Sequence, residues 1–314
     1  MQVAGSTIAQ SAAFTATELS VLLRLIDSGI LSHTDAKIIR TFKDKYIVTT
    51  EVDEPVTDTA VDTGVRVIHI ILPAFNEEKS LPSLLKRFGH LSNRKNIIVW
   101  VVDDGSSDDT ARIAKQGVPG VDVRLVSHTK NLGLGQALLT GIETAMRHAL
   151  DDDVLVVMDA DDTHDPELIA KMLHRIDKGA DIAIASRFVD GGDDHTAPRF
   201  RRLLSRGASF VFNTFLPLNG IHDFTSGFRA YRAGLLRRAV NHWGERLIEE
   251  RGFACMVELL LKLRYSSPTV AEVPFHLQYD RKQSGSKLKL WRTLGQYLKL
   301  ALRDKLEPPP IRMV

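Results

Sequence analysis

Apolar and polar positions follow two different patterns along this chain. From Val65 onward, short runs that are almost wholly apolar are separated by stretches in which apolar residues recur every three or four positions, which predicts strands alternating with amphipathic helices. The expected strands are 65–72, 96–103, 121–127, 154–159 and 181–185, and the expected helices are 77–88, 108–115, 135–148 and 166–178. Strands that are apolar throughout are typical of a parallel sheet with both faces covered. We therefore predict an α/β fold with a mostly parallel, doubly wound, Rossmann-like sheet and helices on both faces.

The segment before this alternation has a different character. Residues 1–52 predict a small helical appendage, with helices at about 17–28 and 34–46. Residues 53–64 are acidic, rich in threonine and without periodicity, which indicates a linker. The main domain is then expected to span residues 65–286.

Residues 287–314 are predicted to form a basic amphipathic helix, about 287–305, followed by a tail. Trp291, Leu294 and Leu298 share one face of this helix, and lysines and arginines lie elsewhere on it. Such a helix suits the surface of a membrane, and packing against the main domain is the equal alternative.

The single Cys255 excludes an intramolecular disulfide and is compatible with a reducing compartment. The N-terminus lacks the basic and apolar regions of a signal peptide. The longest apolar runs, near 65–72 and 97–102, are far shorter than the roughly 20 residues that a membrane span needs. We expect a cytoplasmic protein whose contact with a membrane, if any, is peripheral.

Charge is distributed unevenly along the chain. Residues 1–186 contain 19 Lys and Arg against 27 Asp and Glu, whereas residues 187–314 contain 22 against 12. A basic second half fits an anionic substrate or anionic lipid headgroups, with solvated surface charge as the alternative. No nucleic-acid partner is expected.

The strand predicted at 154–159 ends in two carboxylates, Asp159 and Asp161. In an extended chain, residues i and i+2 project to the same side, so both acids point toward one place. Two hard oxygen donors at the carboxyl end of a parallel strand suit a divalent cation that carries a diphosphate. Asp159 is a candidate for the ribose and the metal, and Asp161 for the metal.

Two other predicted strands end in polar sequence, Asn76-Glu77 and Asp103-Asp104. Any one of these ends can be a turn or a helix cap, but three at the same edge of a sheet favour a ligand site. One carboxylate of Asp103-Asp104 is a candidate contact for a nucleobase or ribose. Gly133 belongs to a tight loop that either lets the backbone approach a nucleotide or is a plain turn.

Several segments, in their order along the chain, resemble a known family. The segments Pro73-Ala-Phe-Asn-Glu77, Val102-Asp-Asp-Gly-Ser-Ser107, Asn131-Leu-Gly-Leu-Gly-Gln136, Asp159-Ala-Asp161 and Ala185-Ser-Arg187 resemble the ordered motifs of the inverting GT-A glycosyltransferases of family 2. The later segments Arg201-Arg202, Ser205-Arg206-Gly207, Asp223-Phe-Thr-Ser-Gly-Phe-Arg229, Glu272-Val-Pro274 and Arg281…Ser284-Gly-Ser-Lys287 are similar to the dolichol- or polyprenol-phosphate mannose synthases. The resemblance covers roughly residues 66–290.

The resemblance implies a role for many of these residues. Those expected to line the nucleotide sugar are Pro73, Ala74, Asn76, Glu77, Asp103, Asp104, Gly133 and Asp159. It also implies that Asp159 and Asp161 hold Mg²⁺ or Mn²⁺ with the diphosphate. Residues expected to bind phosphate groups of donor or acceptor are Arg187, Arg202, Arg206, Arg229, Arg281, Ser286 and Lys287, although arginines of this kind are also common as surface charge. Thr163 stands where the synthases usually have a glutamine able to join the metal shell.

The expected reaction is a single displacement at the anomeric carbon of a nucleoside-diphosphate sugar, mannose favoured, with a polyprenyl or dolichyl phosphate as acceptor. A phosphate acceptor is already ionised and needs no general base, because its second pKa is about 6. A hydroxyl acceptor would need a carboxylate, and Asp223 is the candidate base, equally placed to brace Arg229 or to cap a turn. A non-catalytic sugar-nucleotide-binding or scaffold protein, docking on a protein partner through residues 1–50, is the alternative of another class.

Overall fold

The structure is a computed structural model that describes residues 66–91, 96–196, 202, 221–281, 296, 297 and 300. The predicted N-terminal appendage and linker lie outside the described residues. So does most of the predicted basic helix, of which Gln296, Tyr297 and Leu300 are described and helical.

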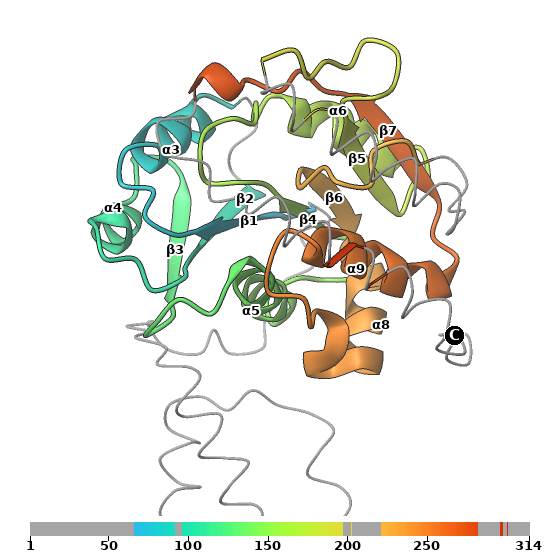
Figure 1. Ribbon diagram of the computed structural model, residues 1–314, viewed down its shortest axis with the longest axis horizontal. Helices are drawn as coiled ribbons and strands as arrows, with labels where there is room; N and C mark the ends of the chain where they lie inside the picture. The colour runs from blue at the N-terminus through green and yellow to red at the C-terminus, as the bar shows by residue number, and fades with distance from the viewer. Residues whose placement is uncertain are drawn as a thin grey trace, which may run out of the picture. The chain divides into compact units, whose positions relative to one another are not determined.

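A single seven-stranded sheet forms the centre of the protein (Figure 1). Its strands are β1 (Ile68–Ala74), β2 (Ile97–Asp103), β3 (Asp122–Ser127), β4 (Val154–Val157), β5 (Ile182–Ser186), β6 (Arg229–Arg232) and β7 (Val270–Pro274), in the spatial order β3-β2-β1-β4-β6-β5-β7. All neighbouring pairs are parallel except the two made by β6, which runs antiparallel between β4 and β5. The predicted mostly parallel sheet is confirmed, and β6 and β7 are strands that the sequence pattern did not reveal.

Helices cover both faces of this sheet. They are α3 (Leu81–His90), α4 (Thr110–Gln116), α5 (Leu134–Met146), α6 (Leu168–Asp177), α8 (Ala233–Trp243) and α9 (Cys255–Leu263), with short 3-10 helices η2 (Gly244–Leu247), η3 (Arg264–Ser266) and η4 (Tyr279–Arg281). Ile71 of β1 packs into a core with α5, α8 and α9, whereas its neighbour Ile70 packs into a second core with α3 and α6. Alternate residues of a strand face opposite sides of a sheet, so the continuous apolar strands fill two cores at once.

Helices α3, α4 and α6 begin later than the apolar periodicity predicts, and hydrogen bonds in the preceding loops account for α3 and α6. The carbonyl of Glu77 accepts the N–H groups of Ser80 and Leu81 in a turn, so α3 begins at Leu81 and Glu77 stays in the loop after β1. The Asp165 carboxylate, just before the fourth predicted helix, accepts the Glu167 N–H, and α6 begins at Leu168. Both shifts leave polar residues in the loops at the carboxyl ends of the strands.

The register of the sheet brings these loops together. Ala74 at the end of β1 pairs with Asp103 at the end of β2, and the Met158 N–H beyond β4 donates to the Ile71 carbonyl of β1. The polar residues that follow β1, β2 and β4 therefore meet at one edge, where ligands bind in open parallel sheets.

We predict that Gly141→Ala destabilises the protein while Gly89→Ala does not. A Cβ at Gly141 of α5 would lie 2.4 Å from Cγ2 of Ile71, which is branched and fixed in the central strand. Overpacking of this kind costs about 1–3 kcal/mol. A Cβ at Gly89 of α3 meets no atom within 4 Å, so alanine should stabilise that helix by up to about 1 kcal/mol. Urea denaturation measures both changes, and equal effects of the two substitutions would contradict this account of the α5 contact.

Candidate active site

The loops after β1 and β2 are joined by a set of short hydrogen bonds. Asn76, in the left-handed region at φ 52°, accepts the Ser107 N–H at 2.9 Å through its Oδ1 and donates its own N–H to Ser106 Oγ at 2.9 Å. Asp103 Oδ1 accepts the Ser106 N–H at 3.1 Å. Asparagine tolerates this backbone conformation better than most residues. The structure thus brings the predicted nucleotide residues Asn76 and Asp103 to one place, with Pro73 and Ala74 on the adjoining end of β1.

Asp104 faces away from this cluster and braces the next loop. Its Oδ1 accepts the Leu132 N–H at 2.9 Å, its Oδ2 accepts the Gly133 N–H at 2.8 Å, and His128 Nδ1 lies 2.7 Å from Oδ1. His128 Nε2 is 3.0 Å from Thr140 Oγ1 on α5. The carboxylate is buried, so the expected contact between Asp104 and the nucleotide is corrected to an internal support of the 131–133 loop.

The loop that contains Gly133 packs tightly against the backbone of another segment. Gly133 has φ +99°, and a Cβ there would lie 2.6 Å from the Arg251 carbonyl oxygen. A Cβ on Gly135 would lie 1.9 Å from the Glu250 carbonyl oxygen. Glycine is therefore required here for close approach of two backbones. The approach of a nucleotide to Gly133 stays a prediction.

The loop after β4 holds the pair of acids that the sequence analysis singled out. Asp159 has 35% of its side chain exposed, whereas Asp161 is 7% exposed. Thr163 donates to Asp161 Oδ1 through its Oγ1 at 2.7 Å and through its N–H at 3.2 Å. His164 Nδ1 accepts the Asp159 N–H at 3.1 Å, and its ring stacks on Phe228. Thr163 thus fixes the orientation of the Asp161 carboxylate.

These two carboxylates have the chemistry that a hard divalent cation requires. Mg²⁺ and Mn²⁺ prefer oxygen ligands, and one or two carboxylates together with substrate phosphates and water usually complete the magnesium shell. Gly227 lies directly beside Asp159, because a Cβ there would be 3.4 Å from Asp159 Oδ1. The residues present therefore fit a metal that carries a diphosphate.

Arg229 is a structural residue, contrary to the expected phosphate contact. Its side chain is fully buried, and its guanidinium donates to the Phe224 carbonyl at 2.7 Å and to the Met256 carbonyl near the start of α9. A phosphate has no access to a group in this position. Arg229 instead ties the 224–227 turn to α9.

Asp223 forms a buried ion pair with Arg187. Arg187 Nε and Nη2 donate to the two carboxylate oxygens at 2.7 Å each, and Nη2 also donates to Thr225 Oγ1 at 2.7 Å. Burial by itself would raise the pKa of Asp223, but Arg187 outweighs it and holds that pKa below its ordinary value. A fully buried carboxylate with a lowered pKa is a poor proton acceptor. Asp223, the candidate base for a hydroxyl acceptor, is therefore a brace, and the arginine that it braces is Arg187 rather than Arg229. It also caps a turn, the other alternative, because its Oδ1 accepts the N–H groups of Thr225 and Ser226.

Sequence reasoning assigned no role to Glu272, which supports the same turn. Its Oε1 accepts the Asp223 N–H and its Oε2 accepts the His222 N–H, each at 3.0 Å. The Glu272-Val-Pro274 motif was a signal that this position matters, but not of what the carboxylate contacts. Asp223 and Glu272 together fix the backbone that leads into β6.

Comparison with known sequences identifies the family. The sequence model described as Glycosyl transferase family 2 matches residues 69–239, more than half of the chain. The chain belongs to glycosyltransferase family 2. The predicted family is thereby confirmed.

This family-2 protein is similar in sequence to curated mannosyltransferases. It is 37% identical over 233 residues to the dolichol-phosphate mannosyltransferase of Pyrococcus furiosus, which covers 74% of this chain but only 62% of the relative's length. It is 34% identical over 226 residues to the polyprenol monophosphomannose synthase of Mycolicibacterium smegmatis, which covers 70% of this chain and 82% of the relative.

Solved structures show that the family-2 domain has the predicted GT-A fold. The glucosyl-3-phosphoglycerate synthase of Mycobacterium tuberculosis, solved with Mn²⁺, UDP and glucosyl-3-phosphoglycerate, matches with a TM-score of 0.56 at 18% identity. The match covers 79% of this chain and 82% of that one. The same enzyme solved with Mg²⁺ and UDP matches with a TM-score of 0.54 at 19% identity, over 79% and 82% of the two chains.

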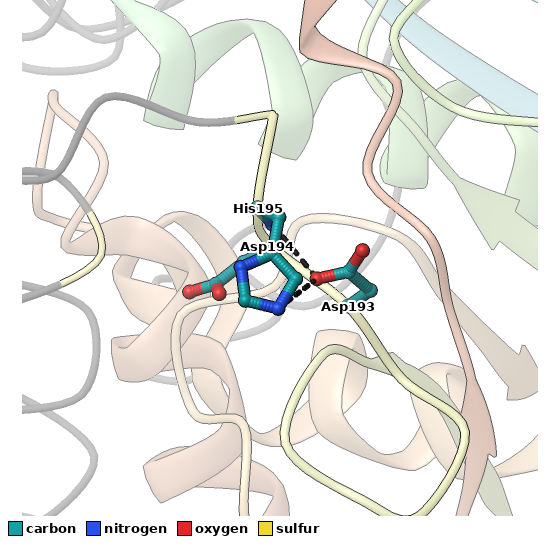
Figure 2. Close-up of side chains that lie close together, drawn as sticks. All are labelled: Asp193, Asp194 and His195. Carbon is teal, nitrogen blue, oxygen red and sulfur yellow. Dashed lines mark hydrogen bonds and ion pairs between the residues drawn. The ribbon is translucent and has the colours of Figure 1, made fainter.

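A second group of ionisable side chains lies in the segment that follows β5, where the Asp193 N–H donates to the carbonyl of Phe275, just after β7. Among the described residues, Asp193, Asp194 and His195 form one group whose ligand atoms are all within 4.8 Å of one another (Figure 2). His195 Nδ1, however, is 2.9 Å from Arg202 Nη1, and an arginine can only donate. The remaining ring proton then sits on Nε2, 3.4 Å from Asp193 Oδ1. A guanidinium at this distance opposes the binding of a cation, so these contacts form a hydrogen-bonded group.

Of the other predicted phosphate-binding residues, two lie in the described part of the chain and three do not. Arg202 contacts His195, and Arg281 is exposed at the end of η4. Arg206, Ser286 and Lys287 lie outside the described residues. None of the helices in the described part of the chain is both long and apolar enough to cross a membrane.

We predict that Asp223→Asn lowers the free energy of unfolding by about 3–5 kcal/mol, because it leaves Arg187, with only 13% of its side chain exposed, without its ion-pair partner. The exposed pair of Asp122 with Arg124, 2.8 Å apart, offers a matched control. Asp122→Asn should cost less than about 1 kcal/mol. Urea denaturation at neutral pH measures both. A stable Asp223→Asn variant that binds nucleotide but has lost all turnover would instead restore the base assignment.

Proposed function

We propose that the protein transfers a sugar, with mannose favoured, from a nucleoside-diphosphate sugar to a polyprenyl or dolichyl phosphate. In this proposal Asp159 and Asp161 hold Mg²⁺ or Mn²⁺, and the transfer inverts the configuration of the anomeric carbon. The donor follows from the chemistry of the strand ends, and the acceptor from the names of the relatives together with the supply of cationic side chains.

One observation carries the proposal. Of the acids at the ends of β2 and β4, namely Asp103, Asp104, Asp159 and Asp161, only Asp159 is not buried, and it stands beside a neighbour whose orientation Thr163 fixes. An open carboxylate next to an oriented one, beside the Asn76 and Asp103 loops, is the arrangement that a metal-bound diphosphate requires. When bound, the metal would neutralise the charge that develops on the departing nucleoside diphosphate.

The residues of the chain have separate tasks in this reaction. Asn76 and Asp103 bind the nucleoside, and the fixed loops after β1 and β2 hold it in one orientation without a cost in loop ordering. Asp159 and Asp161 place the diphosphate. The sugar would lie next to Asp159, close to Gly227.

A phosphate acceptor agrees with the finding that Asp223, the candidate base, is engaged in an ion pair. The buried Asp223 is engaged by Arg187 and does not serve as a proton acceptor. A phosphate monoester is largely ionised at neutral pH and attacks without losing a proton to the enzyme. Positioning by cations is then sufficient, and the residues proposed for it are Arg187, Arg202, Arg206, Arg281, Ser286 and Lys287.

The lipid part of the acceptor would lie at a membrane surface. Two curated relatives are named for transfer to, or synthesis of, dolichol- and polyprenol-linked mannose. The basic amphipathic helix predicted at 287–305 would bring the catalytic edge to such a surface from the cytoplasmic side.

We predict that the protein with GDP-mannose, Mg²⁺ and a short polyprenyl phosphate yields a mannosyl-phospho-lipid detectable by mass spectrometry. Separate incubations with UDP-glucose and UDP-N-acetylglucosamine test the choice of donor. Asp161→Asn should reduce product at least 100-fold because it weakens both metal and diphosphate binding. This reduction corresponds to a loss of about 3 kcal/mol of transition-state stabilisation. Asp177→Asn, an exposed acid at the end of α6 that pairs with Arg66, is the matched control and should retain activity.

Two outcomes would overturn parts of this proposal. Hydrolysis of the donor without a lipid product would point to a hydroxyl acceptor. The absence of donor turnover in every combination, together with preserved nucleotide binding, would favour a non-catalytic binding protein.

A further inference from the structure

An arginine from a helix holds the chain at each end of β4. Before the strand, Arg237 of α8 donates to Asp151 Oδ1 at 2.6 Å, to the Met146 carbonyl at 3.2 Å and to the Ala149 carbonyl. After the strand, Arg87 of α3 donates to Asp162 Oδ1 and Asp165 Oδ1 at 2.7 Å each and to the His164 carbonyl at 3.2 Å. We call these two sets of arginine hydrogen bonds clamps. Both use a guanidinium as donor and carboxylates and carbonyls as acceptors, but only the Arg87 clamp binds the loop that contains Asp161.

The residue that Arg87 grips has an unfavourable backbone conformation. Asp162 has φ +61°, in the left-handed region that residues other than glycine rarely adopt. It is buried, and its second carboxylate oxygen accepts the Ser83 hydroxyl at 2.9 Å. Such a conformation persists where the surroundings impose it. Arg87 and Ser83, one turn apart on α3, are those surroundings.

The conformation of Asp162 has a direct effect on its neighbour Asp161. Asp162 stands between Asp161 and Thr163, and the left-handed turn at this residue directs the Thr163 N–H and hydroxyl back onto Asp161 Oδ1. If Asp162 relaxed to a right-handed or extended conformation, these two hydrogen bonds would be lost. The orientation of the Asp161 carboxylate therefore depends on the contact between Arg87 and Asp162.

Helix α3 also connects this clamp to the nucleotide loop. It begins at Leu81, just after the loop of Asn76 and Glu77, and the Glu77 carbonyl accepts the Leu81 N–H at 2.9 Å. The same rigid element thus fixes the loop after β1 and the loop after β4. Side chains that orient metal ligands from outside the metal shell typically change metal affinity 10–100-fold when they are replaced.

We propose that Arg87, acting through Asp162, is a positioning residue that sets the affinity of the Asp159–Asp161 pair for a divalent cation. The inference rests on the proposed function, in which that pair holds Mg²⁺ or Mn²⁺ with a nucleoside diphosphate. Arg87 touches neither the metal nor the substrate in this account; it holds one ligand in the orientation that binds the metal.

The test is a titration of the full-length protein with Mn²⁺ in saturating GDP or UDP, in which the EPR signal of free Mn²⁺ reports the metal that is not bound. Arg87→Met should weaken Mn²⁺ binding about tenfold or more. Arg87→Lys should have an intermediate effect, because an ammonium replaces the fork that reaches two carboxylates. Arg237→Met removes the corresponding clamp before β4, and we expect it to leave the Mn²⁺ affinity unchanged even though it also lowers the midpoint of thermal unfolding.

Two variants that carry Asp162→Gly test whether Arg87 acts through the Asp162 carboxylate. Asp162→Gly accepts a positive φ without strain and should fold well, yet it should weaken Mn²⁺ binding as Arg87→Met does. The double variant Arg87→Met/Asp162→Gly should bind Mn²⁺ no more weakly than either single variant, because both remove the same contact.

Several results would overturn the inference while leaving the proposed function intact. These are wild-type Mn²⁺ affinity in Arg87→Met, equal losses in Arg87→Met and Arg237→Met, or additive losses in the double variant. Failure of the wild-type protein to bind Mn²⁺ with either nucleotide would instead overturn the proposed function itself. Circular dichroism of each variant verifies that it is folded.

Discussion

Buried carboxylates that accept backbone N–H groups hold the loops at the carboxyl ends of the strands. A loop that enters a protein interior must find partners for its amides, and a carboxylate with two oxygens can serve several of them at once. Asp104 accepts two such groups from the 131–133 loop, and Asp223 accepts those of Arg187, Thr225 and Ser226. Glu258, buried on α9, accepts the N–H groups of residues 249 and 250. The loops at the carboxyl ends of the strands therefore depend on buried carboxylates for their conformation.

The need to pair the backbone N–H groups of buried loops divides the acidic residues at this edge of the sheet into two groups. Acids that serve loop amides or buried arginines are hidden and fully engaged, as Asp223 is by Arg187. Asp159 is left as a partly exposed carboxylate at the end of β4, and Asp161 keeps a fixed orientation beside it. A rigid frame of this kind lets two ligands meet a metal without a conformational rearrangement, which is how preorganised sites lower the cost of binding. The position of the predicted metal site thus follows from which carboxylates are used to accept the backbone N–H groups of the loops.

The sequence was a good guide to the sheet because parallel strands buried on both faces need continuous apolar runs, and β1, β2, β4 and β5 each contain one. The edge strand β3 alternates apolar and polar residues instead. The sequence pattern missed β6, whose Arg-Ala-Tyr-Arg sequence has no such run and whose buried Arg229 donates to the carbonyls of Phe224 and Met256. It located Asp159 and Asp161 correctly at a strand end. It treated Asp103 and Asp104 alike, although adjacent residues at the end of a strand face opposite sides. The partners of Asp104 and Asp223 come from other loops, so they could not be deduced from local sequence.

In the proposed function, a divalent cation binds with its nucleotide at Asp159 and Asp161. Anomalous diffraction from crystals of the full-length protein grown with Mn²⁺ and GDP tests it most directly, because the manganese signal locates the ion independently of any model of the site. This account predicts a peak within about 2.0–2.6 Å of carboxylate oxygens of both residues, the range for hard cations and oxygen ligands. A manganese peak at Asp193, Asp194 and His195, with none between Asp159 and Asp161, would contradict it.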